Sequence, residues 1–205
     1  MKLDFKKDQK ELYQPKVSPS IVDVGEMTFI AVEGTGDPNT SAAYQAAIEL
    51  LYGLSYAIKM GNKDVLEYAV GPLEGFWSLA GGASVDFTKP LDKDAFVWTA
   101  VIRQPDFVDD AVFEEAKTKL AKKKPHLDVG NARLMRLTEG LCVQSLHIGS
   151  FDDEPATIAE MEAFALDQGY ALDLSGERRH HELYMSDFRK TAPEKLKTVI
   201  RHPIK

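Results

Sequence analysis

The chain has 205 residues, of which 44% are hydrophobic, and a formal net charge of −7. This size suffices for one sizeable core or two small fused units, and the negative charge argues against a protein that binds nucleic acid. The N-terminus has no apolar signal region, no stretch approaches a membrane span, and the single cysteine, Cys142, excludes a disulfide within the chain. We therefore expect a soluble protein of the reducing cytoplasm with no membrane partner.

The first half of the chain is predicted to contain one helix and three strands. The strands are expected at 21–33, 67–80 and 95–103, and the helix at 40–60. The helix follows the turn GTGDPN, in which Asn39 could act as its N-cap. The second strand should be irregular around Gly71 and Pro72. The polar linker 81–94 is expected to be an exposed loop.

A connecting helix is predicted at about 109–124. Acidic residues stand at its start and the lysines of 117–124 at its end, which is the distribution that the helix dipole favours. We therefore interpret the basic cluster as a solvated helix end and not as a nucleic-acid patch.

The second half repeats this order. Strands are expected at 133–149, 178–186 and 197–204, and a helix at 152–169. The first of these strands should bend or break at Glu139 and Gly140, and Cys142 within it is expected to be a small core residue. Pro155 in the first turn and Gly169 at the end are typical of helix boundaries.

The two halves also match in detail. The segment PLEGFWS aligns with HHELYMS, which pairs Glu74 with Glu182 and Phe76 with Tyr184. We therefore expect an α+β fold built from a duplicated strand–helix–strand–strand unit, with repeats at about 21–105 and 133–205 in a single domain, 1–205. Their antiparallel sheet should surround a central groove on a pseudo-twofold axis, where a ligand could bind.

The segment RRHHELYMSDFRK raises the question of a metal site. Strand alternation places His180, Glu182 and Tyr184 on one face and His181 on the other. The two histidines cannot converge on one ion from a regular strand, and no further ligands stand at suitable spacing. We therefore predict no metal and no cofactor.

Glu182 is the strongest candidate for chemistry. A carboxylate in mid-strand is costly to bury unless it is used or paired. Arg178 or Arg179 could pair with it, or the side chain could face solvent. The residues alone leave a structural and a functional role about equally supported.

Several aromatic residues could line a ligand site. Tyr52 and Tyr56 are four residues apart on the helix at 40–60, and Trp98 lies on the strand at 95–103. Each of these residues is more often part of a core than of a ligand site. Phe76 and Trp77 should point to opposite faces of their strand, so that only one of them lines the groove unless a bulge intervenes.

Four separated segments together resemble the GyrI-like small-molecule-binding family. They are VDVGEMTFIAVEGTGDPN, GPLEGFW, HIGSFDDEPATIAEMEAF and HHELYMSDFRKTAPEKLKTVIRHPI. The resemblance implies a duplicated unit with an antiparallel sheet that cups a pocket. Many members carry a DNA-binding helix-turn-helix, but only about 20 residues precede the first predicted strand here. We therefore expect the stand-alone type.

The resemblance implies three possible functions. One stand-alone subfamily hydrolyses cyclopropane-bearing DNA alkylators of the yatakemycin class and holds the drug in an aromatic cage. Other members bind planar lipophilic cations without chemistry, and the name-giving member inhibits DNA gyrase. We expect a metal-independent cyclopropyl hydrolase that confers drug resistance by acting on a planar aromatic molecule, with the other two functions as alternatives.

The resemblance also implies roles for individual residues. Glu182 would face the ligand, with a raised pKa that suits a general base, and Tyr184 could donate a hydrogen bond to the developing phenolate. The expected ligand-binding residues are Trp77 (favoured over Phe76), Glu74, Tyr52, Tyr56, Trp98 and Tyr13. His147, in another family motif, is expected to be structural and to bond the backbone at its turn.

Overall fold

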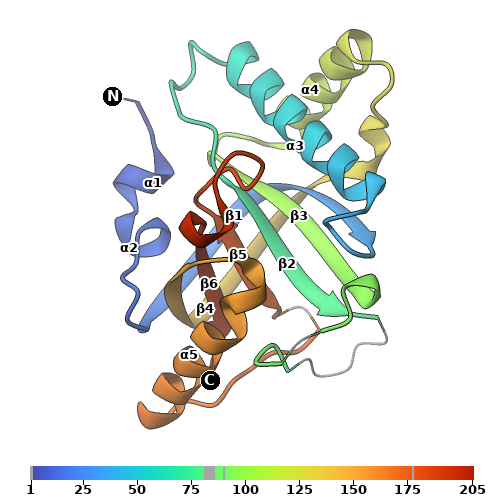
Figure 1. Cartoon of the computed structure of the whole chain (residues 1–205). Helices are drawn as coiled ribbons and strands as arrows, with labels where there is room; N and C mark the ends of the chain where they lie inside the picture. Colours follow the sequence, from blue (N-terminus) through green and yellow to red (C-terminus); the bar gives the residue numbers. More distant parts are fainter. Residues whose placement is uncertain (1, 81–85, 90, 177) are drawn as a thin grey trace.

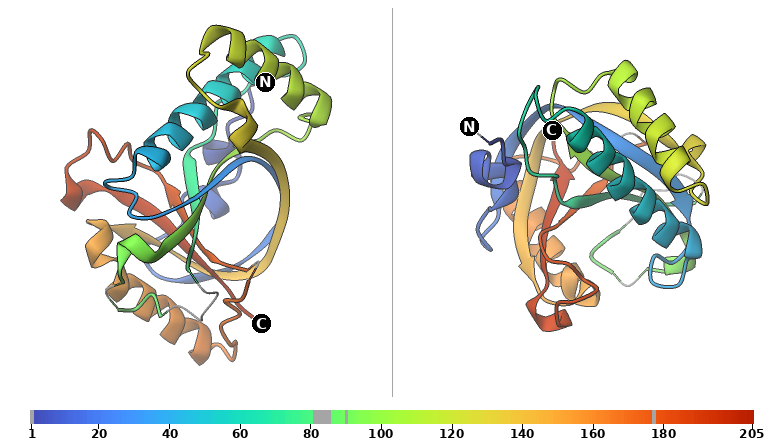
Figure 2. Two further views of the ribbon diagram at one scale, coloured as in Figure 1. Left: turned by 90° about the vertical axis from the view of Figure 1, so that its right-hand side faces the viewer. Right: turned by 90° about the horizontal axis from the view of Figure 1, so that it is seen from above.

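The fold is a six-stranded antiparallel barrel with helices on its outside (Figures 1 and 2). The computed structural model describes residues 2–80, 86–89, 91–176 and 178–205. The strands are joined in the order β1-β3-β2-β5-β6-β4 and close on themselves. Their bounds are Ser20–Thr35 (β1), Leu73–Leu79 (β2), Phe96–Gln104 (β3), Ala132–Ile148 (β4), His180–Tyr184 (β5) and Lys197–Pro203 (β6).

Among the described residues, five α-helices accompany the barrel. They span Phe5–Asp8 (α1), Lys10–Tyr13 (α2), Ala42–Gly61 (α3), Asp110–Lys123 (α4) and Glu154–Asp167 (α5). Short 3-10 turns occur at Lys93–Ala95, Val129–Asn131, Phe151–Asp153 and Pro193–Lys195. Within the described residues, no helix is long and apolar enough to cross a membrane.

The predicted α+β fold with an antiparallel sheet is confirmed, and each expected helix and long strand is present. The closure of the sheet into a barrel and the two short N-terminal helices were not predicted. The pseudo-twofold relation between the two repeats, and their limits, stay predictions.

Two local expectations need correction. The second strand begins at Leu73 and not at residue 67, because Pro72 has no amide hydrogen for a ladder. The N-cap of α3 is Ser41, whose hydroxyl accepts a hydrogen bond from the Tyr44 amide at 3.3 Å. Strand β4 does not break at position 140, but Gly140 adopts a φ of 67°, so the backbone is irregular at the expected place.

The linker after β2 is also less exposed than expected. Residues 81–85 and 90 lie outside the described residues, but Phe87 is buried and its ring stacks on His180 with centroids 4.1 Å apart. This part of the linker therefore contributes to the core.

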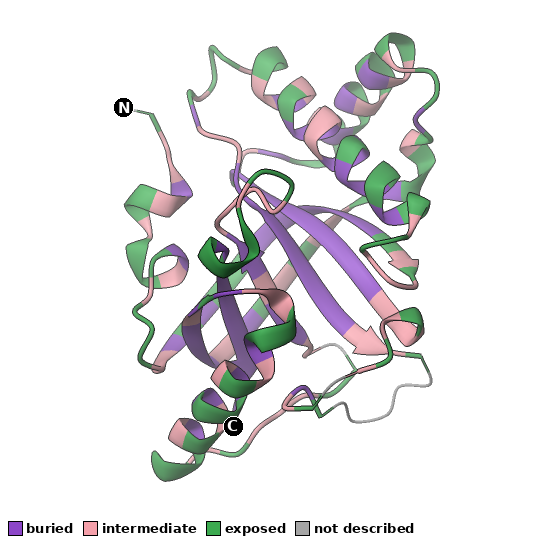
Figure 3. Cartoon of the chain, viewed as in Figure 1, coloured by how far each residue is buried: buried purple, intermediate pink, exposed green. Residues whose placement is uncertain are grey.

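The barrel wall is buried on both faces, and strands β2 and β3 are coloured as buried along most of their length (Figure 3). The outer face packs on α3, α4 and α5 through side chains such as Ile30, Trp77 and Ile102. The inner face holds a separate apolar cluster that includes Phe29 and Phe76. Because strand residues alternate between faces, neighbours such as Phe76 and Trp77 belong to different environments.

Candidate functional site

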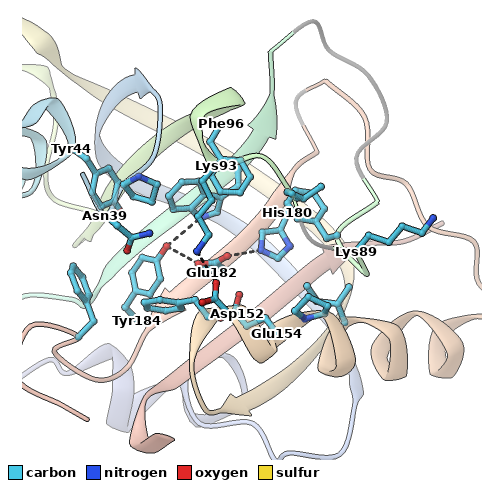
Figure 4. A pocket seen from close by; sticks show the side chains of 18 residues that line it. Asn39, Tyr44, Lys89, Lys93, Phe96, Asp152, Glu154, His180, Glu182 and Tyr184 are labelled. Carbon is cyan, nitrogen blue, oxygen red and sulfur yellow. Dashed lines mark hydrogen bonds and ion pairs between the residues drawn. The ribbon is translucent and has the colours of Figure 1, made fainter. Parts of the chain in front are cut away.

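A cavity of about 320 Å³ lies on the outer face of the barrel, between the wall and the starts of α3 and α5 (Figure 4). Strands β2 and β5 form its floor, and residues before β3 form its rim. Its lining combines aromatic and charged side chains: Pro38, Asn39, Tyr44, Trp77, Phe87, Lys89, Leu91, Lys93, Phe96, Phe151, Asp152, Glu154, Pro155, Ile158, His180, Glu182, Tyr184 and Phe188. This is the concave, mostly apolar setting typical of small-molecule sites.

Glu182 lies at the centre of the cavity floor. Its Oε2 accepts a hydrogen bond of 2.7 Å from the Tyr184 hydroxyl, and its Oε1 lies 2.8 Å from His180 Nε2. The Tyr184 hydroxyl in turn accepts a hydrogen bond of 3.1 Å from Trp77 Nε1. The side chain of Glu182 is 13% exposed, so the carboxylate is held in place but still reaches the cavity.

Glu154, the first residue of α5, places a second carboxyl group beside Glu182. It is 5% exposed, and its Oε1 has no hydrogen-bond partner among the described residues. Burial, and then the negative charge of Glu182, raise the pKa of Glu154 well above its usual value. Glu154 therefore holds its proton more tightly than an exposed glutamate does.

Two tyrosine hydroxyls stay protonated in the cavity. Burial and the charge of Glu182 raise the pKa of both Tyr44 and Tyr184 above the usual value. Both remain hydrogen-bond donors at any physiological pH.

A chain of histidines leads from Glu182 along the outer face of the barrel wall towards α5. His180 Nδ1 lies 2.7 Å from His202 Nε2, and His202 Nδ1 lies 3.2 Å from Glu162 Oε1 without the alignment of a hydrogen bond. Burial, with the charge of His180, lowers the pKa of His202 to about 4, so this ring is neutral. When Glu182 accepts the Nε2 proton of His180, His202 Nε2 donates to His180 Nδ1 and His202 Nδ1 has no proton.

Aromatic rings form the walls around these groups. The centroid of Trp77 lies 5.9 Å from that of Tyr44 and 5.3 Å from that of Phe96. On the other side, Phe151 meets Tyr184 edge to face at 5.8 Å. The cavity can therefore hold a flat apolar ring against the carboxyl group of Glu182.

Three of the residues selected from the sequence line this cavity, namely Glu182, Tyr184 and Trp77. As alternation predicted, Phe76 points to the opposite face, where its ring stacks on His181 with centroids 4.0 Å apart. Phe76 is therefore not part of the cavity lining.

Glu74 and Tyr13 also lie on the inner face, in a buried polar network. The Tyr13 hydroxyl donates to Glu74 Oε1 at 3.3 Å, and Glu74 Oε2 lies 3.0 Å from His181 Nε2. His181 Nδ1 contacts Glu139 at 3.0 Å, and Arg201 donates to Glu139 at 3.1 Å. We call these five residues the inner network; its two members selected from the sequence, Glu74 and Tyr13, do not line the cavity.

The register explains why Glu74 and Glu182 face opposite ways. In the β2–β5 ladder, Glu182 stands opposite Gly75, and Glu74 stands opposite Leu183. A register offset of one residue moves a side chain to the other face of a sheet. The alignment of the two glutamate strands therefore does not bring both carboxylates into one pocket.

The remaining aromatic candidates also lie elsewhere. Trp98 is 1% exposed and packs edge to face against Tyr44, with ring centroids 4.9 Å apart. Tyr52 and Tyr56 stack on each other, with centroids 6.5 Å apart, and line shallower hollows along α3 together with Arg189. None of these three side chains lines the cavity around Glu182.

Tyr44, Phe87, His180 and Glu154 are among the cavity residues that were not selected from the sequence. Phe87 lies in the linker that was expected to be exposed. His180 shares a face with Glu182, as alternation indicated, but was considered only as a metal ligand. Glu154 gave no signal, since an acid at a helix start is common. The structural role expected for His147 is confirmed: its Nε2 lies 2.9 Å from the Ser150 carbonyl oxygen and its Nδ1 2.8 Å from the Thr157 hydroxyl.

Comparison with solved structures identifies two close relatives from Listeria innocua. One, described as a hydrolase, is 41% identical with a TM-score of 0.90, and the match covers 100% of both chains. The other, described as an uncharacterized conserved protein, is 43% identical with a TM-score of 0.92 and the same complete coverage. No curated protein sequence matches the chain.

A distant relative shows the same fold. The C-terminal domain of EcmrR is 12% identical with a TM-score of 0.53, and the match covers 91% of this chain and 96% of that domain. Residues 18–205 also match the GyrI-like small molecule binding domain as a whole. The chain therefore belongs to the family of GyrI-like small molecule binding domains.

Proposed function

We propose that this protein hydrolyses the activated cyclopropane ring of planar, yatakemycin-like DNA-alkylating drugs, with Glu182 as the general base, and so confers drug resistance. The observation that carries the proposal is the carboxyl group of Glu182, held at the floor of an aromatic cavity beside Glu154, whose pKa is raised. The likeness to a Listeria innocua protein described as a hydrolase supports it.

The reaction needs only water and the drug. In such a drug the cyclopropane is conjugated to a dienone. As Glu182 takes a proton from water, the water oxygen bonds to the ring methylene and one ring carbon–carbon bond breaks. Its electron pair moves to the carbonyl oxygen, which becomes a phenolate and then takes up a proton. A general base typically contributes about 10²–10⁴-fold to such a rate.

The aromatic walls would supply the orientation. Trp77, Tyr44 and Phe96 lie on one side of the cavity and Phe151 on the other, so that a flat ring held between them faces Glu182. A fixed attack geometry removes much of the entropic barrier. The Tyr184 hydroxyl donates to Glu182, so we assign it to positioning this carboxylate; to reach a developing phenolate it would have to turn away.

The test is Glu182→Gln, which keeps the shape of the side chain but cannot accept the proton. We expect drug binding within a few-fold of wild type, and turnover lower by about 10²–10⁴-fold, followed by mass spectrometry of the ring-opened product. Trp77→Ala should weaken binding and turnover together. Hydrolysis by Glu182→Gln at the wild-type rate would refute the general-base assignment.

A second candidate function is capture of planar lipophilic cations without chemistry. The carboxyl group of Glu182 among aromatic rings favours it, since each cation–π contact contributes about 0.5–2 kcal/mol. Incubation of stoichiometric protein with cationic dyes and with a cyclopropane drug separates the two functions. Tight dye binding with an unchanged drug mass would favour capture, whereas ring-opened drug would favour hydrolysis.

A further inference from the structure

Glu154, His180 and Glu182 converge in the cavity from two elements, α5 and β5 (Figure 4). Each offers one oxygen or ring nitrogen, and these three atoms lie within 4.8 Å of one another. All three side chains are buried or nearly so, which distinguishes the group from acidic clusters at a surface. We call these residues the cavity triad.

Two atoms in and next to the cavity triad are buried without a partner. Glu154 Oε1 has no hydrogen bond among the described residues, although the side chain is 95% buried beside Glu182. An unsatisfied buried oxygen is costly, and two adjacent carboxylates need either a proton or a cation between them. The other atom is His202 Nδ1, which lies 3.2 Å from Glu162 Oε1 without a hydrogen bond.

We propose that the cavity triad binds a divalent transition-metal ion, most suitably Zn²⁺, with the remaining coordination position open to the cavity. One imidazole and two carboxylates form a ligand set that zinc accepts, and three protein ligands with one open position are typical of reactive zinc sites. Ligand atoms around tetrahedral zinc lie about 3.4 Å apart, so side-chain movements of about 1 Å complete the geometry.

Metal binding at His180 Nε2 would satisfy the first of these atoms, because Glu154 Oε1 would become a ligand. His180 Nδ1 would then carry the proton and donate to His202 Nε2, 2.7 Å away, and His202 Nδ1 would face Glu162 Oε1 at 3.2 Å. An outer hydrogen bond from the second ring nitrogen of a ligating histidine is the usual support of a metal site.

The cations near the triad are already paired with acids. Lys93 lines the cavity but forms an ion pair of 2.7 Å with Asp152, and Lys89 forms one of 2.5 Å with Asp86. Glu154 and Glu182 have no such lysine partner among the described residues. Their charges are therefore available to the ion when Glu154 loses its proton.

This inference goes beyond the proposed function and does not rest on it. In the proposed hydrolysis, Glu182 accepts a proton with no metal present. A bound ion would engage Glu182 as a ligand and prevent it from accepting that proton. The metal-free protein is therefore the form to which the proposed general-base reaction belongs.

The experiment is calorimetric titration of the full-length, chelator-treated protein with Zn²⁺ alone. His126 and Glu49 form an exposed pair at 3.3 Å that could bind zinc weakly, so all titrations use a His126→Ala background. We expect one ion per chain, and an affinity at least tenfold lower in both Glu154→Gln and His180→Gln. His147→Gln replaces another buried histidine outside the triad and should not change the affinity.

X-ray absorption of the zinc-loaded protein in the same His126→Ala background keeps the test decisive if a triad variant fails to fold. The expected spectrum shows one imidazole ligand with oxygen ligands and no sulfur. Absence of stoichiometric binding, equal affinity in folded Glu154→Gln and His180→Gln, or a sulfur ligand from Cys142 would each overturn the proposal. Because no substrate is used, a negative result leaves the proposed hydrolysis untouched.

Discussion

At the scale of single residues, Tyr184 connects the aromatic wall to the carboxylate. Its hydroxyl accepts from Trp77 and donates to Glu182, so that one side chain fixes the ring plane of the indole and the direction of the carboxylate. Neither partner has another hydrogen bond at these atoms within the described residues. The position of Glu182 therefore depends on the phenol oxygen of Tyr184.

Tyr184→Phe tests this dependence. The change leaves the buried Trp77 Nε1 without an acceptor, and we expect the free energy of unfolding to fall by about 1–3 kcal/mol. Turnover should fall as well, since Glu182 loses one of its two hydrogen-bond partners. Urea unfolding and steady-state kinetics measure the two effects.

The matched control is Tyr56→Phe, at a tyrosine that is 52% exposed and outside the cavity. It should change stability by less than about 0.5 kcal/mol and leave turnover unchanged. Equal behaviour of the two variants would contradict the role assigned to Tyr184.

Gly75 lies where Trp77 and Tyr184 leave no room for a larger side chain. A Cβ atom at this position would lie 2.8 Å from Trp77 Nε1 and 3.0 Å from the Tyr184 hydroxyl. The side chains of Trp77 and Tyr184 thus occupy the space beside this glycine. We expect Gly75→Ala to displace both groups, lower stability by about 1–3 kcal/mol and weaken ligand binding.

Gly25→Ala is the control, because a Cβ at Gly25 would meet nothing within 4 Å. It should leave ligand binding unchanged and stability equal or slightly higher, as alanine restricts the unfolded chain more than glycine does. Dye binding and thermal unfolding of the two variants give the comparison. Full binding by Gly75→Ala would show that the contact tolerates a methyl group.

At the scale of elements, strand β5 carries polar side chains on both of its faces. His180, Glu182 and Tyr184 point to the cavity, whereas His181 lies in the inner network. The five residues of β5 thus include the carboxylate proposed as the general base and a histidine of the buried inner network.

The inner network should dominate the energetics of this region. Arg201 is 1% exposed and donates to Glu139, which is 6% exposed. Arg201→Met leaves a buried carboxylate with less counter-charge, and we expect a loss of about 3–5 kcal/mol. The double variant Glu139→Gln with Arg201→Met should recover part of that loss. Urea unfolding of the four proteins tests this, and strictly additive effects would show that the pair is uncoupled.

The same element shows how far the sequence could predict the site. Alternation along β5 correctly placed His180, Glu182 and Tyr184 on one face. It could not show that α5 brings Glu154 to that face, nor that Glu74 faces inward, because both depend on strand register and on distant packing. Phe87 was missed for a similar reason: a polar linker gives no local sign that one ring will stack on His180.

For the whole molecule, the buried charges predict a dependence of stability on acid. Burial alone would raise the pKa of Glu139, but the charges of His181 and Arg201 lower it from its usual 4.5 to about 2. A lowered pKa in the folded state means that Glu139 stabilises the protein above about pH 4.5 and loses this contribution as the pH falls towards 2. Urea unfolding between pH 6 and pH 2 should show this loss, with a shallower slope in Glu139→Gln.

Other carboxylates contribute to the acid dependence, so the comparison with Glu139→Gln isolates one group. Glu26→Gln serves as a control, since Glu26 is an exposed acid on β1. Its pH profile should match that of the wild type. Parallel curves for wild type and Glu139→Gln would show that the inner network does not set the acid limit.

The fold as a whole was predictable to the level of elements, from hydrophobic periodicity and from the repeated order of strands and helices. Barrel closure was not, because it depends on β1 and β4 being long enough, at Ser20–Thr35 and Ala132–Ile148, to pair with each other along most of their length. Strand length at this precision is not encoded in a local pattern.

Closure of the barrel also bears on self-association. Each of the six strands has a hydrogen-bonded neighbour on both sides for part of its length. The two longest strands extend beyond their second neighbours, since β1 pairs with β3 only from residue 28 onwards and β4 pairs with β6 only from residue 142 onwards. Free edges are the usual starting points for cross-β aggregation and strand exchange. Within the described residues, the longest free edges therefore belong to the ribbon that β1 and β4 form together, and we expect strand exchange between native molecules to start there.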